Sequence, residues 1–215
     1  MSEATKTAGA SISEADISYL RDLARRVAEI TSDPIHAQKA DMWRRHNDLE
    51  RVKPMVLTFP EGSWRELMPP STFRIEDRFL RRYERGLLMR IYYWENMLDD
   101  NVIDDIIGSP IVNRHTGWGL QAKSTRPDDP LGAKHFDPVI KDESDVDKLQ
   151  IPELTVDWEE TDRRFSQLSD IFGDILSVEK TGMRRGGICP LDTYSQLRGI
   201  DAMFLDLFDR PEMVH

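Results

Sequence analysis

Residues 99–119 read DDNVIDDIIGSPIVNRHTGWG and contain the segment that decides the fold. Within them, residues 106–112 form a short apolar run that is followed by a glycine-bearing loop, and such a run predicts a β-strand. Two further runs, PMVLTF at 54–59 and DILSV at 174–178, are also predicted to be strands. The run at 54–59 is apolar on both faces and is closed by proline and glycine, as expected of a strand buried in a parallel sheet.

The segments between these strands carry apolar residues at helical spacing. Ser13 and Asp33 are suitable N-cap residues for the first two helices. We therefore predict helices over 13–31, from 34 to about 49, over 71–98, 158–172 and 191–208, and a short one near 144–149. Residues 121–158 are predicted to form a long polar surface excursion, and residues 1–11 to be disordered.

The predicted helix at 71–98 also carries a group of charged residues. Its arginines Arg81, Arg82, Arg85 and Arg90 could form a basic patch. The favoured interpretation is an ordinary solvated helix face, because Glu76, Asp77 and Glu84 alternate with them.

Strands that alternate with helices predict an α/β protein with a parallel sheet. Two architectures fit three strands in a chain of 215 residues. One is an open three-stranded sheet, and the other is the first part of a (β/α)8 barrel of the TIM type. The order of the segments does not separate the two.

The composition limits the class of protein. The chain has 39 acidic and 29 basic residues and a net charge of −10, which argues against nucleic acid or an anionic membrane as a partner. No apolar run is long enough for a membrane span, and the first residues lack the apolar core of a signal peptide. The single cysteine, Cys189, excludes an internal disulfide framework and fits a reducing compartment. We expect a soluble cytoplasmic protein.

The last residues, DRPEMVH at 209–215, have the pattern of a helix start. Asp209 is a candidate N-cap, Pro211 fits the first turn, and Glu212 completes a capping box. Only three residues follow Glu212, too few for a stable helix. We therefore expect this helix to be unfinished.

Two stretches, RVKPMVLTFPEGSWREL at 51–67 and ICPLDTYSQLRGIDAMFLDLFDRPEMVH at 188–215, resemble the uroporphyrinogen decarboxylase superfamily, which includes corrinoid-dependent methyltransferases. ESDVDKLQIPE at 143–153 is similar to a short acidic helix of that family. The resemblance implies a (β/α)8 barrel of which this chain is the N-terminal part. The implied organisation is a disordered N-terminus at 1–11, a helical segment at 12–52 and an incomplete barrel at 53–215.

The loop after the strand at 54–59 is the first candidate site. Functional residues of a (β/α) barrel follow its strands, which makes Glu61 a catalytic candidate and Trp64 and Arg65 substrate-binding candidates. Decarboxylases of the family have an arginine-bearing motif here that holds the carboxylates of the substrate, and this chain has TFPEGSWREL with Arg65 alone. The missing arginine favours the methyltransferase branch. Equally open is a structural role, with Trp64 packed and Arg65 paired with Glu66 or Glu61.

The loop after the strand at 106–112 offers Asn113, His115 and Trp118 as substrate-binding candidates. A lone histidine in a loop is more often a solvated or hydrogen-bonding residue than a ligand. Asp105 is assigned by resemblance to the catalytic acidic residue, although it precedes its strand and functional residues of such barrels follow theirs.

The segment after the strand at 174–178 contains Glu179, a substrate-binding candidate, and Tyr194. PLDTY at 190–194 resembles a family segment whose tyrosine contacts the substrate, so Tyr194 is assigned as catalytic. A half-buried tyrosine with an internal hydrogen-bond partner is the alternative. Cys189 suggests zinc, but the zinc ligands of the family lie in the C-terminal half of the barrel, so Cys189 is expected to be an ordinary small residue.

Three functions remain open at this point. The first is transfer of a methyl group between a small substrate and the corrinoid of a partner protein, with no cofactor held by this chain itself. The second is cofactor-free decarboxylation of a porphyrinogen or a smaller carboxylated substrate. The third is a non-catalytic fragment, or one half of a split barrel that self-associates or pairs with a C-terminal partner chain, because an incomplete barrel has open strand edges. Zinc is expected only if a C-terminal half supplies its ligands.

Overall fold

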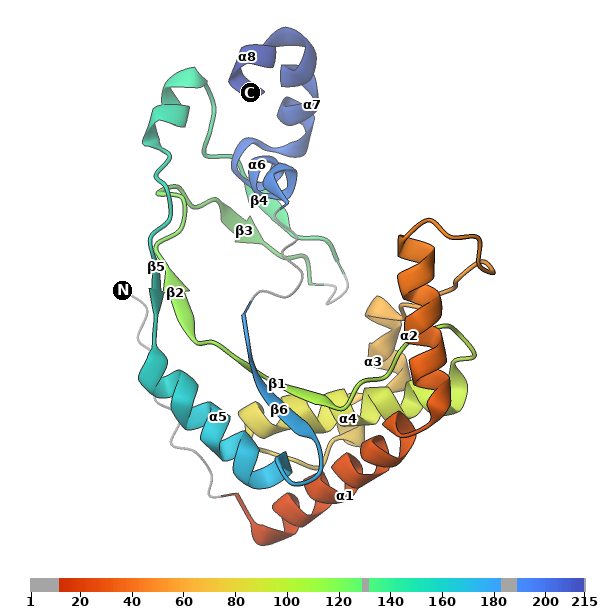
Figure 1. Ribbon diagram of the computed structural model, residues 1–215. Helices are drawn as coiled ribbons and strands as arrows, with labels where there is room; N and C mark the ends of the chain where they lie inside the picture. Colours follow the sequence, from red (N-terminus) through yellow and green to blue (C-terminus); the bar gives the residue numbers. More distant parts are fainter. Residues whose placement is uncertain (1–11, 129–131, 183–188, 215) are drawn as a thin grey trace. The chain divides into compact units, whose positions relative to one another are not determined.

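The computed structural model of the chain describes residues 12–128, 132–182 and 189–214 (Figure 1). The predicted disordered segment 1–11 and most of the predicted turn after the third strand lie outside these residues. The chain divides into two compact units. Unit 1 consists of residues 1–110 and 161–181, and unit 2 consists of residues 111–160 and 182–215.

Three long helices of unit 1 begin at capped N-termini. Ser13 caps α1 (Glu14–Thr31), Asp33 caps α2 (Pro34–Asn47) and Asp77 caps α4 (Arg78–Asn96), each through a side-chain oxygen that accepts a backbone N–H. The first two starts confirm the sequence prediction. The predicted start of the third helix near residue 71 is wrong, because short turns (η2, Pro70–Thr72) and an extended segment precede α4.

The core of unit 1 lies between α1, α4, α5 (Trp158–Phe172) and a pair of strands. Leu20, Ala24 and Val27 of α1, at spacings of four and three, face this core and are fully buried. Burying each large apolar side chain there stabilises the fold by about 1.5–3 kcal/mol. The largest is Phe172, the last residue of α5.

The core also contains a charged residue, Glu84, which is fully buried within α4. Its carboxylate accepts the backbone N–H groups of Arg74 at 2.7 Å and Ile75 at 3.1 Å. The expectation that Glu84 lies on a solvated face is therefore wrong. The residue anchors the segment that enters α4, and its charge is stabilised by these N–H donors.

The predicted strand at 54–59 does not form. Its backbone pairs with two carboxylates instead of a neighbouring strand. The N–H groups of Val56 and Thr58 donate to Asp100 at 2.9 Å and Asp99 at 2.8 Å, and Lys53 pairs with Asp100 at 2.5 Å. Local apolar content predicted a strand here, but the segment remains exposed and irregular.

The other two predicted strands form a parallel pair. Strand β1 (Ile106–Pro110) lies beside β6 (Ser177–Thr181), with Ile106 opposite Ser177 and Pro110 opposite Thr181. This confirms a strand within 106–112 and moves the third strand three residues toward the C-terminus. Helix α5, whose bounds match the predicted 158–172, precedes β6 in the chain.

Unit 2 contains two small antiparallel pairs and several short helices. The pairs are β2 (Asn113–His115) with β5 (Leu154–Val156) and β3 (Lys123–Thr125) with β4 (His135–Asp137). The other elements are η3 (Glu143–Lys148), α6 (Pro190–Arg198), α7 (Ile200–Asp209) and α8 (Pro211–Val214). Unit 1 also has the short η1 (Glu61–Ser63) and α3 (Trp64–Leu67). The expected excursion at 121–158 thus contains strands.

The predicted helix at 191–208 is divided at Gly199, which has a φ of +86° and joins α6 to α7. A Cβ atom at this position would meet Cγ of Pro138 at 2.9 Å, so glycine suits both the backbone and the packing. The predicted N-cap Asp209 is instead the last residue of α7.

The fold is therefore mixed, with helices and three small sheets among the described residues. The prediction that the chain combines helices and strands is confirmed. The predicted barrel is not shown, because the described residues form no closed sheet. No described helix combines the length and the apolar character needed to cross a bilayer.

Candidate functional site

The parallel pair β1–β6 has two different faces. Ile107, Ser109 and Val178 face the helical core, because Ile107 and Val178 pack within it and Ser109 is fully buried. Alternation along a strand places Ile106, Gly108, Ser177, Glu179 and Thr181 on the opposite face, which we call the outer face.

Contacts at Gly108 support this assignment. Gly108 lies opposite Glu179, and a Cβ atom built on it would approach Cγ2 of Thr181 to 3.1 Å. None of the outer-face residues is fully buried. The predicted substrate-binding residue Glu179, which was expected after this strand, is the middle residue of β6 and is partly exposed on the outer face.

The edge of β1 away from β6 is occupied by side chains. Ile106 donates its N–H to Asp104 at 3.2 Å, and its C=O accepts from Arg90 at 2.6 Å. The C=O of Gly108 accepts from the hydroxyl of Tyr83 at 3.2 Å. Pro110, the next residue that faces this edge, has no N–H. This edge therefore offers few groups to another strand.

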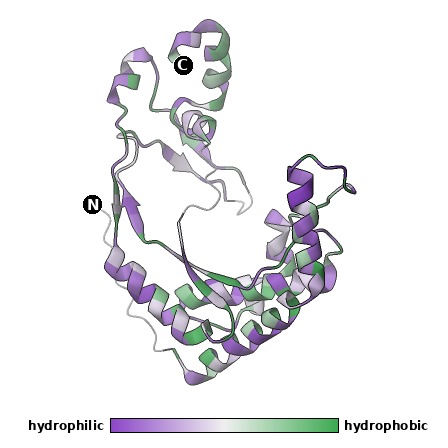
Figure 2. Ribbon diagram, viewed as in Figure 1, coloured by the Kyte–Doolittle hydropathy of each residue, from purple (hydrophilic) through white to green (hydrophobic). Residues whose placement is uncertain are grey.

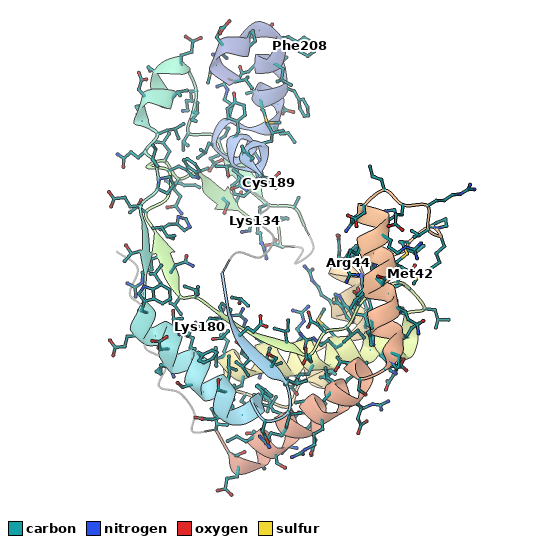
Figure 3. All side chains as sticks on the ribbon, viewed as in Figure 1. Met42, Arg44, Lys134, Lys180, Cys189 and Phe208 are labelled. Carbon is teal, nitrogen blue, oxygen red and sulfur yellow. The ribbon has the colours of Figure 1, made fainter. Side chains whose placement is uncertain are left out.

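The edge of β6 away from β1 differs. The N–H group of Ser177 donates to the C=O of Asp105 at 3.0 Å, so the backbone groups of Ser177 face β1. Because neighbouring residues of a strand point their backbone groups to opposite sides, the N–H and C=O groups of Val178 and Lys180 face away from β1. No strand pairs with this edge among the residues that the structure describes. The side chain of Lys180 lies on the core side, where it pairs with Asp162 at 2.5 Å (Figure 3).

The first predicted loop is placed on η1 and α3. Trp64 is buried, with its ring centroid 5.6 Å from those of both Tyr92 and Tyr93. Glu61 and Arg65 are exposed, and in the described residues Arg65 forms no ion pair with Glu61 or Glu66. The alternative to a substrate-binding role was that Trp64 packs and Arg65 pairs with Glu61 or Glu66. The packing of Trp64 is observed, and the ion pair of Arg65 is not formed.

Asp105 lies at the amino end of β1, as the sequence indicated. Its carboxyl group is exposed, and with Asp104 and Ile103 it lines a cavity of about 460 Å³ whose other walls are α1, Ser32 and Ile175. Glu179 lies opposite Gly108, three residues further along the strand pair. The structure thus does not bring these two carboxylates together.

Three predicted substrate-binding residues lie on or after β2, in unit 2. Asn113 donates to the C=O of Ile111 at 3.2 Å, and Nδ1 of His115 accepts the N–H of Gly117 at 3.2 Å. Trp118 is about half exposed, at 47%. The polar groups of Asn113 and His115 serve local turns, so no contact here joins the three into one site.

Tyr194 belongs to a buried ionic cluster in unit 2. Its hydroxyl donates to Asp206 at 2.9 Å, and Asp206 also accepts two bonds from the Arg198 guanidinium, at 2.7 and 3.0 Å. Arg198 in turn donates to the C=O groups of Ile140 and Lys141. Arg210 adds a contact to Asp206 at 3.2 Å.

The cluster fixes the protonation of its members. Hydrogen bonding from Arg198 lowers the pKa of Asp206 to about 2, against the effect of burial. Burial and the bond to Asp206 raise the pKa of Tyr194, so its hydroxyl stays protonated. The arrangement gives Tyr194 an internal partner, and its catalytic role stays a prediction.

A second cavity, of about 640 Å³, lies beside this cluster in unit 2. Residues 133–138 of β4 and its flanks form one wall, and the junction of α6 and α7 at Gly199 forms the other. Lys134, His135, Asp192 and Asp201 contribute charged or titratable groups. Sequence reasoning missed this cavity because it treated residues 191–208 as one helix, although Gly199 signalled an interruption.

Metal binding finds no support in the described part of the chain. No group of three or more histidine, cysteine, aspartate or glutamate side chains is placed to hold a metal ion there. Cys189 was expected to be an ordinary small apolar residue. It lies at the start of α6 and is exposed, so it does not contribute to a core.

Comparison with protein families, with curated proteins and with solved structures finds no match for this chain.

Proposed function

We propose that the chain provides the substrate-binding side of a methyltransferase of the uroporphyrinogen decarboxylase type. In this proposal a methyl group moves between a small substrate and a corrinoid carried by a partner protein. The observation that carries the proposal is the outer face of β1–β6, where Thr181 ends β6 and Glu179 lies two residues before it, on a parallel pair whose other face packs on helices. Parallel α/β enzymes bind their substrates at the carboxyl ends of their strands.

The proposal includes a (β/α) barrel that is only partly formed by this chain. Further parallel strands are expected to add at the open edge of β6, because the edge of β1 is occupied by Arg90, Tyr83 and Asp104. Closing a barrel on the β1 side would require these contacts to be replaced.

Each group has a separate role in this mechanism. The corrinoid would supply the cobalt that takes up or releases the methyl group. Glu179 would orient the heteroatom of the substrate and hold or accept its proton, because a carboxylate next to a bound amine or thiol can do either. Zinc activation is not part of the proposal, since the described side chains do not fit a zinc site.

Decarboxylation is less well supported by the same region. A porphyrinogen carries several carboxylates, which arginines hold well. Between residues 54 and 73 the chain has Arg65 alone, and Arg65 is exposed on α3. A smaller substrate therefore fits better.

The experiment measures methyl transfer from methylcobalamin to 2-mercaptoethanol, followed by the loss of methylcobalamin absorbance. Transfer in the other direction is measured from methylamine, anisole and dimethyl sulfide to cob(I)alamin, which is kept reduced by a chemical reductant and is converted to methylcobalamin. We expect Glu179→Gln to lower the rate about tenfold or more, and the matched change Glu76→Gln, at an exposed position before α4, to leave it unchanged. No transfer with any of these compounds, or equal rates in both variants, contradicts the proposal. Release of CO₂ from coproporphyrinogen would instead favour the decarboxylase.

A further inference from the structure

Helix α7 presents a set of large apolar side chains to solvent. Phe208 is 86% exposed and Phe204 57%, and Ile200 and Leu205 are exposed to a similar extent. Figure 2 shows the apolar residues of α7 in green between its aspartates, and Phe208 is labelled in Figure 3. We call these four residues the α7 face. A contiguous group of this kind on a soluble surface marks an interaction site more often than scattered apolar residues do.

The orientation of this face is fixed by the other side of the helix. Met203 and Asp206 point inward and are buried, and Asp206 is held by Arg198 and Tyr194. A rotation of α7 that buried its phenylalanines would break the Arg198–Asp206 pair, which is costly for buried charges. The α7 face is therefore a stable feature of unit 2.

The charges around the α7 face are acidic. Asp201 lies on the same side of the helix as Phe204 and Phe208, three and seven residues before them. Asp209 and Glu212 follow at the C-terminal end, and both are exposed. Of the cations near this helix, Arg210 is directed at Asp206, 3.2 Å away, and Lys134 lines the cavity beside Asp201 together with a further acidic residue, Asp192. A partner that covers this face must therefore supply positive charge.

A second copy of the chain does not meet this requirement. In a two-fold pair of α7 helices centred near Phe204 and Leu205, Asp201 of each copy would lie opposite Asp209 of the other. Two like-charge contacts, in a chain with a net charge of −10, oppose that pairing. Anionic membranes are disfavoured for the same reason.

We propose that the α7 face docks a partner protein that presents an apolar helix face edged by lysine or arginine. The apolar residues at positions 200, 204 and 208 are spaced for packing between helices, and Asp201 supplies the ionic contact. The proposal concerns unit 2 alone and does not depend on methyl transfer.

The probe is a synthetic amphipathic peptide of about 18 residues, helical in water, with a leucine face and a lysine edge. Its labelled form is titrated with the full chain, and binding is followed by fluorescence anisotropy. We expect Phe204→Ser and Phe208→Ser each to weaken binding about tenfold, as central aromatic residues of interfaces do. Phe59→Ser, at a position 62% exposed in unit 1, is the matched control and should bind like the wild type.

Further measurements separate charge from apolar contact. Asp201→Asn should reduce the salt dependence of binding, and a peptide with glutamate in place of lysine should bind at least tenfold more weakly. Equal binding by all variants, or equal binding of the glutamate peptide, overturns the proposal. Self-association in light scattering that Phe208→Ser abolishes would assign the face to a second copy. Sedimentation with phosphatidylcholine vesicles that Phe208→Ser abolishes would assign it to a membrane.

Discussion

The two units differ in the interactions that stabilise each of them internally. Unit 1 buries leucines, isoleucines and Phe172 between α1, α4 and α5, whereas the buried centre of unit 2 is the Arg198–Asp206 pair with few apolar side chains around it. The stabilising free energy of an apolar core depends little on pH. That of a buried ion pair depends on the presence and the charge of both partners, and therefore on pH. The two units should therefore respond differently to substitution and to acid.

The largest expected effect is in the core of unit 1. Phe172→Ala leaves a cavity at a fully buried position, so we expect the free energy of unfolding to fall by about 3–5 kcal/mol in urea titrations. Phe208→Ala in unit 2 is the same chemical change at a position 86% exposed and should change it by less than about 0.5 kcal/mol. Similar losses in both variants would show that the contrast between the units is wrong.

The next effect tests the ionic centre of unit 2. Asp206→Ala leaves the buried Arg198 without its carboxylate, and we expect a loss of about 3 kcal/mol, seen as faster hydrogen exchange in α6 and α7. The exposed Asp209→Ala is the control. The double variant Arg198→Met/Asp206→Leu should lose much less than Asp206→Ala, because no unpaired charge remains. An equal loss in both would contradict this reading.

A smaller effect is expected on acidification. Hydrogen bonds from Arg198 and from Lys148 lower the pKa of Asp206 and Asp145, each to about 2 from 3.8. A carboxyl group whose pKa is lower in the folded state stabilises above its unfolded pKa, and this contribution disappears as the pH falls. Hydrogen exchange in unit 2 should therefore accelerate between about pH 4 and pH 2, relative to α5. In Asp206→Asn the change should be smaller, and an unchanged response would argue against the cluster.

Local signals in the sequence predicted part of this fold. Ser13 and Asp33 cap helices in the structure as expected, and α5 has the predicted bounds, because caps and apolar spacing act within a few residues. The strand predicted at 54–59 does not form, because its backbone N–H groups bond to Asp99 and Asp100 instead of a neighbouring strand. These partners lie more than forty residues away in the sequence, so no local pattern indicated them. The prediction that Glu84 lies on a solvated helix face was wrong because its carboxylate is buried against the backbone N–H groups of Arg74 and Ile75, which lie outside the helix.

The candidate site was predictable to a similar degree. Glu179 was expected just after the third strand, but β6 begins three residues later than predicted, so Glu179 lies within the strand, opposite Gly108. Its role in substrate binding stays a prediction. The environment of Tyr194 depends on Asp206, which is positioned by the interruption at Gly199. The wall opposite that junction comes from residues 133–138, far from it in the sequence, so no local pattern predicted the cavity.

The residues that contact a bound substrate can be located directly by NMR. Methylamine, anisole and dimethyl sulfide are added in turn to the ¹⁵N-labelled chain, and the backbone amide signals are followed by NMR. We expect the amide signals of Gly108, Glu179 and Thr181 to shift with at least one compound, and Glu179→Gln to weaken this response. Shifts confined to residues around Lys134 and Ser195 in unit 2, or no shift with any compound, would contradict the assignment of the outer face of β1–β6 as the binding site.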